Sequence, residues 1–196
     1  MKTYEIELEL TEEMLGTLPN DQDIYRSYIA SKAPDASTIE DEIEAVGVDD
    51  VVEKGITVFA RDKDGNPCIY DYLIKGFFKN ACKAMRESTD SKSKDLKAYK
   101  TKIDNLVFVE PRMIPIQING ELGICSRPLR ASTAQGDRVA ISSSESVSAG
   151  SKLSFKVTIL DDSFEKFLME WLDYGKFNGL GQWHNSGKGR FTYIIK

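Results

Sequence analysis

The chain of 196 residues contains a single histidine, three cysteines and two tryptophans, and these low counts exclude several classes of function. One histidine cannot supply both the acid and the base of a two-histidine ribonuclease. The cysteines are odd in number and widely spaced, with no Cys-x-x-Cys pair, so the sequence indicates neither a zinc site nor a disulfide framework. Such thiols suit the reducing environment of the cytoplasm, which is where we expect the protein.

Long apolar runs and the motifs of common enzyme classes are absent as well. Residues 1–30 hold no positively charged start followed by a long apolar stretch, and nowhere do about eighteen apolar residues stand together. The sequence therefore predicts no signal peptide and no contact with a membrane. It also lacks the phosphate-binding Gly-x-x-x-x-Gly-Lys-Ser/Thr, the dinucleotide-binding glycine fingerprint and the Gly-x-Ser-x-Gly of hydrolases. We expect no cofactor and no metal.

The net charge of -5 conceals a division of the chain into an acidic and a basic part. Residues 1–72 carry 18 acidic and 6 basic side chains, which is a net charge of -12, whereas residues 73–196 carry 13 acidic and 20 basic side chains, which is +7. The basic part can form a local electropositive surface on an acidic protein. The acidic part predicts either repulsion of nucleic acid or docking onto a basic protein surface.

Hydrophobic periodicity predicts one α+β domain over residues 1–196. Apolar side chains alternate in Tyr4–Leu10 and Leu153–Ile159, as in half-buried strands, and they recur at helical spacing in Asp71–Arg86 and between Asp162 and Gly175. The order of these elements predicts a ferredoxin-like (RRM-like) βαββαβ antiparallel sheet that ends in a strand at Phe191–Ile195. Because the first strand presents glutamates and no aromatics to solvent, we expect RNA to bind elsewhere than on this sheet face.

Three segments interrupt this plan. Residues 20–54 are predicted to form an acidic helical insertion after the first strand, and residues 88–104 a lysine-rich loop. Residues 127–151 contain three arginines and a serine-rich run around a turn at 135–137, which favours a protruding β-ribbon. Such a ribbon can reach a nucleic acid or only decorate the surface.

The helix predicted over Asp71–Arg86 carries a cationic stripe. Lys75, Lys79 and Lys83 recur every four residues. A solvated lysine face is the usual explanation of such spacing. Gly76 favours a functional role, because glycine inside a helix costs about 1 kcal/mol relative to alanine and indicates the close approach of another backbone or a ligand.

The segment from Gly179 to Phe191 contains four glycines, two cations, the second tryptophan and the only histidine. Glycine allows another backbone to approach closely, and Lys188 and Arg190 supply charge for phosphates. The alternative is a plain C-terminal hairpin turn. Trp183 would stack either on a base or on the core.

Several short stretches, taken in order, resemble the RAMP superfamily, whose members bind CRISPR RNA. They are Arg-Asp-Lys-Asp-Gly-Asn-Pro at 61–67, Leu-Ile-Lys-Gly-Phe-Phe-Lys-Asn-Ala at 73–81, Ser-Ala-Gly-Ser-Lys-Leu-Ser-Phe at 148–155, and the glycine-rich segment. Two features depart from the family: Tyr70-Asp71-Tyr72 stands where it usually has Gly-Ser-Ser, and the acidic N-terminal third has no counterpart.

The resemblance implies that basic side chains hold the phosphates and riboses of a guide-type, single-stranded RNA. Together with the basic helix and the glycine-rich segment, it gives a set of predicted RNA-binding residues: Lys75, Lys79, Lys83, Arg127, Arg130, Arg138, Trp183, His184, Lys188 and Arg190. The implied partners are RNA, CRISPR effector proteins and further copies of the chain along the same RNA.

Three classes of function remain open on the sequence. The first is a non-catalytic RNA-binding protein that acts as a subunit of a CRISPR-type ribonucleoprotein, or as a mobile-element-encoded decoy that inhibits one. The second is a metal-independent endoribonuclease that uses His184 or an aspartate loop with Asp21 and Asp23, although these aspartates are also suited to cap a short helix. The third is an acidic protein-interaction module that imitates nucleic acid.

Overall fold

The computed structural model describes residues 1–20, 56–133 and 136–196; for residues 129–133 and 136–140 it describes the backbone alone. It is an α+β structure with two largely antiparallel sheets. The first sheet has the order β12 (Phe191–Ile195), β1 (Lys2–Leu10), β11 (Lys152–Ile159), β8 (Met113–Gln117), β6 (Pro67–Tyr70) and β5 (Ala60–Arg61), and β7 (Val107–Glu110) also pairs with β11.

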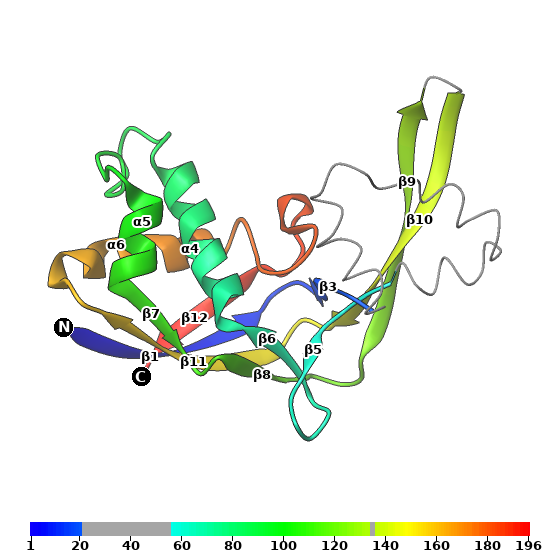
Figure 1. The fold of residues 1–196 in the computed structure, drawn as a ribbon, viewed down its shortest axis with the longest axis horizontal. Coiled ribbons are helices and arrows are strands. Elements are labelled where there is room, and N and C mark those ends of the chain that lie inside the picture. The colour runs from blue at the N-terminus through cyan, green and yellow to red at the C-terminus, as the bar shows by residue number, and fades with distance from the viewer. Residues whose placement is uncertain (21–55, 134–135) are drawn as a thin grey trace, which may run out of the picture.

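The second sheet contains the ribbon, which projects from the end of the first sheet (Figure 1). Its order is β2 (Met14–Leu15), β10 (Gly136–Val147), β4 (Thr57–Val58) and β3 (Leu18–Pro19), with β9 (Gly123–Thr133) paired to β10. The sequence predicts a ribbon over 127–151, whereas the ribbon strands begin earlier, at Gly123, and end earlier, at Val147. Most of the predicted insertion at 20–54 lies outside the described residues.

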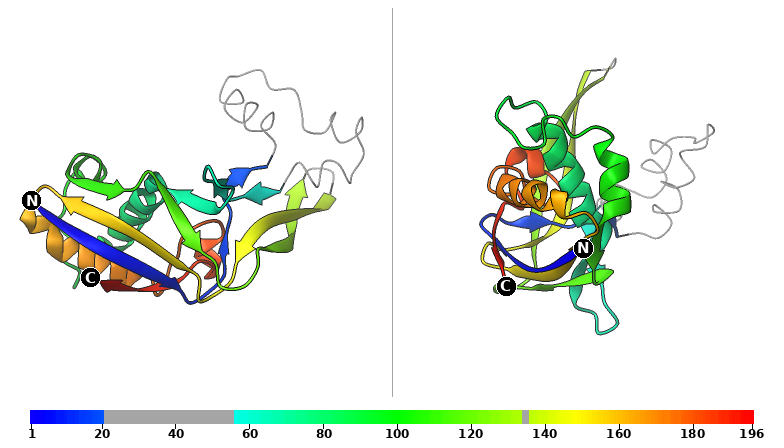
Figure 2. Two further views of the ribbon diagram at one scale, coloured as in Figure 1. Left: turned by 90° about the horizontal axis from the view of Figure 1, so that it is seen from below. Right: turned by 90° about the vertical axis from the view of Figure 1, so that its left-hand side faces the viewer.

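The helices cover one face of the first sheet and leave the other face open (Figure 2). They are α4 (Asp71–Met85), α5 (Tyr99–Leu106) and α6 (Glu165–Tyr174), with short 3-10 turns at η1 (Asp162–Phe164) and η2 (His184–Ser186). No helix in residues 1–20, 56–133 and 136–196 has the length and apolarity needed to cross a membrane.

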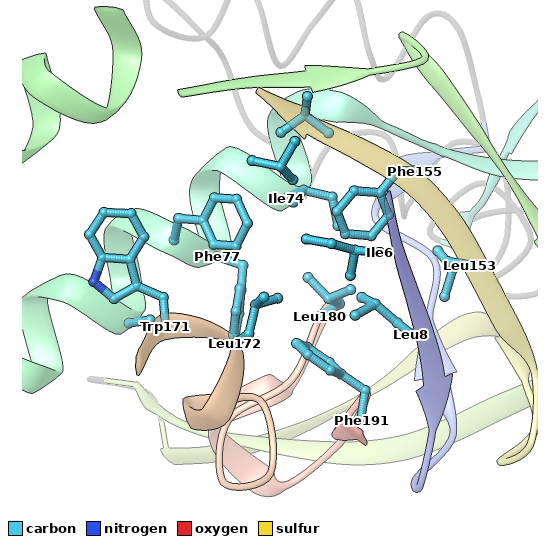
Figure 3. Close-up of a cluster of buried hydrophobic side chains, with 14 of the residues drawn as sticks. Ile6, Leu8, Ile74, Phe77, Leu153, Phe155, Trp171, Leu172, Leu180 and Phe191 are labelled. Carbon is cyan, nitrogen blue, oxygen red and sulfur yellow. The ribbon is translucent and has the colours of Figure 1, made fainter. Parts of the chain in front are cut away.

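The core lies between the helices and the first sheet. Phe77 of α4 packs edge-on against Phe191 of β12 with ring centroids 5.1 Å apart (Figure 3). The ring of Phe78 lies 5.8 Å from that of Trp171 of α6. Ile6 of β1 is also buried there. Each such side chain stabilises the fold by about 1.5–3 kcal/mol on burial, which explains why the apolar stripes of both helices face the sheet.

The open face of the first sheet is a ladder of ion pairs. Glu5 of β1 pairs with Lys156 of β11 at 2.9 Å, and Glu7 pairs with Lys152 of β11 and Lys196 beyond β12. The lysines lower the pKa of Glu5 and Glu7 through hydrogen bonds and charge. The anionic surface expected from β1 alone is therefore neutralised by its neighbouring strands, which a single-strand pattern does not reveal.

The structure differs from the sequence-based expectation at two places. Residues 88–98 of the predicted lysine-rich loop form turns against α6, and α5 begins at Tyr99. The helical stretch expected from Asp162 is capped by the preceding residue, Asp161, whose side chain accepts a hydrogen bond from the backbone N–H of Ser163 at 2.9 Å. This cap opens η1, which precedes α6.

Candidate nucleic-acid interface

The glycine-rich segment leaves α6, folds back on itself and enters β12. The N–H of Leu180 donates to the carbonyl of Gly189 at 3.0 Å. A Cβ on Gly179 would overlap the backbone of Gly189, and one on Gly189 would overlap the carbonyl of Leu180. These two glycines are therefore required by the chain's own backbone, rather than by the backbone of another molecule.

The segment is fixed to β2, and β2 is fixed to the ribbon. The N–H of Gly189 donates to the carbonyl of Glu13 at 2.7 Å, and a Cβ on Gly181 would overlap the carbonyl of Leu15. Leu15 in turn pairs with Ser146 of β10. The glycine-rich segment and the base of the ribbon thus meet at β2, and we call the side chains gathered there the loop–ribbon junction, which consists of Arg127, Trp183, His184, Lys188 and Arg190.

Trp183 is the most unusual residue of the junction. Its backbone adopts a left-handed conformation with φ of 60°, which a bulky side chain rarely takes and which costs on the order of 1–3 kcal/mol. The guanidinium of Arg127, from β9, lies over its half-buried indole ring. Arg127 Nε is buried and has no hydrogen-bond partner among the described residues. The fold thus holds an arginine–tryptophan stack in place at an energetic cost.

His184 follows directly and has a defined tautomer. Its Nδ1 lies 3.0 Å from the carbonyl of Gly181. Because a carbonyl only accepts, Nδ1 carries the proton in the neutral ring, and Nε2 is left as a hydrogen-bond acceptor. Such an acceptor suits a hydroxyl donor, for example a ribose 2′-OH.

The two cations of the glycine-rich segment are partly committed within the protein. Lys188 forms an ion pair with Glu13. The Nε of Arg190 donates to the carbonyl of Phe177 at 3.1 Å, which leaves the terminal nitrogens of the guanidinium for other contacts. Arg190 is therefore better placed than Lys188 to bind a phosphate.

The predicted lysine stripe of α4 lies apart from the junction. Lys79 forms an ion pair with Asp104 of α5 at 2.5 Å, and Lys75 donates to the carbonyl of the same residue at 3.3 Å. Lys83 is exposed at the end of α4. Nothing lies within 4 Å of the position that a Cβ would take at Gly76, so no neighbouring group among the described residues requires glycine there. The stripe thus serves in part to join α4 to α5.

Four predicted site residues have no described side chain. Arg130 and Arg138 lie in β9 and β10, in the part of the ribbon given by its backbone. Asp23 lies outside the described residues, as does Asp21. The structure therefore brings together Arg127, Trp183, His184, Lys188 and Arg190 from the predicted set.

A second aromatic group, which the sequence analysis missed, lies at the start of α4. Tyr70 and Tyr72 stack with ring centroids 5.3 Å apart, and the guanidinium of Arg112 lies 5.8 Å from the ring of Tyr70. Tyr70 and Leu73 line a small hollow together with Gly181 of the glycine-rich segment, so the start of α4 is close to the junction. The signal in the sequence was the Tyr-Asp-Tyr triplet that replaces the family's Gly-Ser-Ser.

The junction suits recognition of a flat, anionic partner. Aromatic and guanidinium planes stack on nucleobases, and arginine binds phosphate in a bidentate manner. No group of three or more metal-ligating side chains occurs in the part of the chain that the structure describes. The side chains of the junction provide stacking, charge and hydrogen bonding.

No protein-family model and no curated protein matches the chain. Among solved structures, it resembles a chain in the cryo-EM structure of the type III-B Cmr-β complex bound to cognate target RNA, with a TM-score of 0.57 and 9% identity. It shares its fold with a subunit of that CRISPR complex. The match covers 100% of this chain and 60% of that one, so the chain spans little more than half of its neighbour. A chain of a type IV-B CRISPR complex matches with a TM-score of 0.49 and 11% identity, over 100% of this chain and 90% of that one.

Proposed function

We propose that the chain is a non-catalytic, RAMP-type RNA-binding subunit of a CRISPR ribonucleoprotein that holds single-stranded, guide-type RNA at the loop–ribbon junction. The fold shared with a Cmr-β subunit supports this role. The strand order β12-β1-β11-β7, with α4 and α6 on one face, supports the ferredoxin-like plan of that superfamily. CRISPR effector proteins and further copies of this chain along the RNA are the proposed partners.

The observation that carries the proposal is the stack of Arg127 on Trp183. The outer plane of the guanidinium can receive a nucleobase, which then extends a base–arginine–tryptophan stack. Because every base has a flat face, this grip tolerates any sequence, as a subunit that holds guides of varied sequence requires. The Nε2 acceptor of His184 and the terminal nitrogens of Arg190 add contacts to the ribose and the phosphate.

Binding without cleavage is proposed because acid–base cleavage needs a proton acceptor and a proton donor. His184, the one histidine, can fill one of these two roles, and its Nδ1 is bonded to the Gly181 carbonyl rather than to a carboxylate that would orient the ring as a general base. The endoribonuclease alternative predicts shortened RNA products that disappear in His184→Ala while binding persists. Incubation of end-labelled RNA with both proteins distinguishes the two functions.

The binding test compares Trp183→Ala and Arg127→Ala with Phe108→Ala, which removes an aromatic ring that is 41% exposed on β7, outside the junction. Loss of one stacked base costs about 1–3 kcal/mol, which corresponds to a rise in Kd of about 5- to 140-fold. We expect this rise for both junction variants in fluorescence anisotropy with a labelled single-stranded RNA, and no change for the control. Unchanged affinity in both junction variants would overturn the proposal. Salt-dependent binding to a basic protein without any RNA affinity would favour the nucleic-acid mimic instead.

A further inference from the structure

Exposed lysines without an ion pair are scattered singly over the described residues, as at Lys63 and Lys166, except around the end of α4, where they gather. Ion pairs with carboxylates hold the lysines of the first sheet and its C-terminal end, of the turn after α6 and of the glycine-rich segment, namely Lys2, Lys152, Lys156, Lys196, Lys176 and Lys188. By contrast, five lysines around the end of α4 form no ion pair with any carboxylate among residues 1–20, 56–133 and 136–196, and all five are exposed: Lys83, Lys92, Lys94, Lys97 and Lys100. We call these five the basic cap.

The basic cap is held in place by a buried network. The carboxylate of Glu170, on α6, accepts hydrogen bonds from the backbone N–H of Lys92 at 2.6 Å and of Ser93 at 3.0 Å, and from the hydroxyl of Ser93. The indole N–H of Trp171 donates to the same hydroxyl at 3.0 Å. Leu96 is buried in the core. With Ser93 and Leu96 turned inward, the lysines that flank them are presented to solvent as a fixed array.

The chemistry of the cap fits phosphates better than a protein partner. None of the large exposed apolar side chains of the described residues lies between residues 83 and 102, and the ring of Tyr99 is covered by the Arg86 guanidinium at 5.2 Å. Protein interfaces need an apolar centre and are depleted in lysine. Lysine without exposed aromatics is instead suited to hold a phosphate backbone without reading bases. Three carboxylates of the same segment, on Glu87, Asp90 and Asp95, dilute but do not reverse the positive charge.

The cap is distant from the loop–ribbon junction. The junction adjoins the start of α4, since Gly181, Tyr70 and Leu73 line one hollow, whereas the cap lies at the other end of the helix (Figure 1). The 15 residues of α4 span about 22 Å. A nucleic-acid strand with about 3.4 Å per stacked nucleotide needs roughly seven nucleotides to cover that length.

We propose that the basic cap is a second RNA-binding surface, which grips the phosphate backbone of RNA that extends beyond the junction. The choice of RNA rests on the proposed function, but the surface itself does not depend on the junction. Its grip is independent of base sequence and sensitive to salt. Long RNA therefore contacts the junction and the cap, and short RNA contacts the junction alone.

The test compares Lys94→Gln/Lys97→Gln with Lys63→Gln/Lys166→Gln, which changes the charge equally at exposed lysines outside the cap. Affinities for oligouridine of 6 and of 20 nucleotides are measured by anisotropy over a range of salt concentrations. Each phosphate contact contributes about 0.7 to the slope of log K against log salt. We therefore expect the cap variant to lower that slope by about 1.4 on the 20-mer and to leave the 6-mer unchanged, while the control changes neither.

If the cap variant has the same salt slope on the 20-mer as the wild type or the control variant, the proposal is overturned. Trp183→Ala in parallel separates the two surfaces: if only the junction hypothesis fails, Trp183→Ala is neutral and the cap effect persists, and if only the cap hypothesis fails, the reverse holds. Sedimentation of the protein without RNA tests whether the cap instead binds a second copy of the chain. Self-association that the cap substitutions abolish, with the RNA salt slope intact, would assign the cap to a second copy of the chain and would also overturn the proposal.

Discussion

Replacement of Ser93 by alanine tests the network that supports the basic cap. Ser93 is fully buried, and its hydroxyl both accepts from the Trp171 indole at 3.0 Å and donates to the Glu170 carboxylate. The substitution leaves the buried indole N–H without its partner, which costs about 1–3 kcal/mol. It also removes a hydrogen bond to a charged group, worth about 1.5 kcal/mol at the low end that suits a half-buried carboxylate. We expect a loss of about 2.5–4.5 kcal/mol in the free energy of unfolding.

Urea denaturation followed by far-UV circular dichroism measures this loss, with the exposed Ser88→Ala as the matched control. The control should change the free energy by less than about 0.5 kcal/mol. In a Trp171→Phe background, no indole N–H remains to be orphaned, so the cost of Ser93→Ala should fall by about 1 kcal/mol or more. A Ser93→Ala protein as stable as the control, or an equal cost in both backgrounds, would refute the network argument.

Two further predictions concern titratable groups. Burial raises the pKa of the Cys68 and Cys82 thiols. A thiol reagent at pH 8 should therefore label one cysteine of the native protein, the partly exposed Cys125, and all three cysteines after denaturation. Rapid labelling of all three in the native protein would contradict the burial of Cys68 and Cys82. The pKa of Glu7 is lowered below its ordinary 4.5 by Lys196 and Lys152, so its contribution to stability is present above that pH and is lost as the pH falls through the folded-state value. The Glu7→Gln protein should accordingly show a flatter decline of melting temperature below about pH 4.5, and a decline identical to that of the wild type would show that the ladder does not stabilise the fold.

Strong periodicity made the sheet and its helices predictable from the sequence. The alternation in Tyr4–Leu10 and the stripe around Trp171 both report burial, and both segments have the predicted type in the structure. The clustering of Trp183 with His184 was predictable because the two residues are adjacent in sequence. The approach of Arg127 was not, because it depends on the pairing of β2 with β10, a contact between segments more than a hundred residues apart.

The partners of charged side chains were the least predictable feature. The stripe of Lys75 and Lys79 has the spacing of a solvated or ligand-binding face, yet both side chains contact Asp104 of α5. The segment that contains Ser93 has a composition typical of mobile loops, and its fixed turns depend on Glu170, 77 residues further along the chain. Local composition does not encode such distant hydrogen bonds, so neither the neutralised stripe nor the fixed cap follows from it.

The short pairing of β3 with β4 determines where the acidic segment enters and leaves the fold. Leu18 pairs with Val58 and Pro19 with Thr57, and the N–H of Asn20 donates to the carbonyl of Ile56 at 2.9 Å. Both ends of the segment are thus clasped side by side, and β4 pairs directly with β10 of the ribbon. This strand pair is suited to be an insertion site. The chain between β3 and β4 can be exchanged, shortened or fused to another domain while the pairing of the two strands is kept. A domain inserted there would lie beside the base of the ribbon, next to the RNA proposed to bind at the junction.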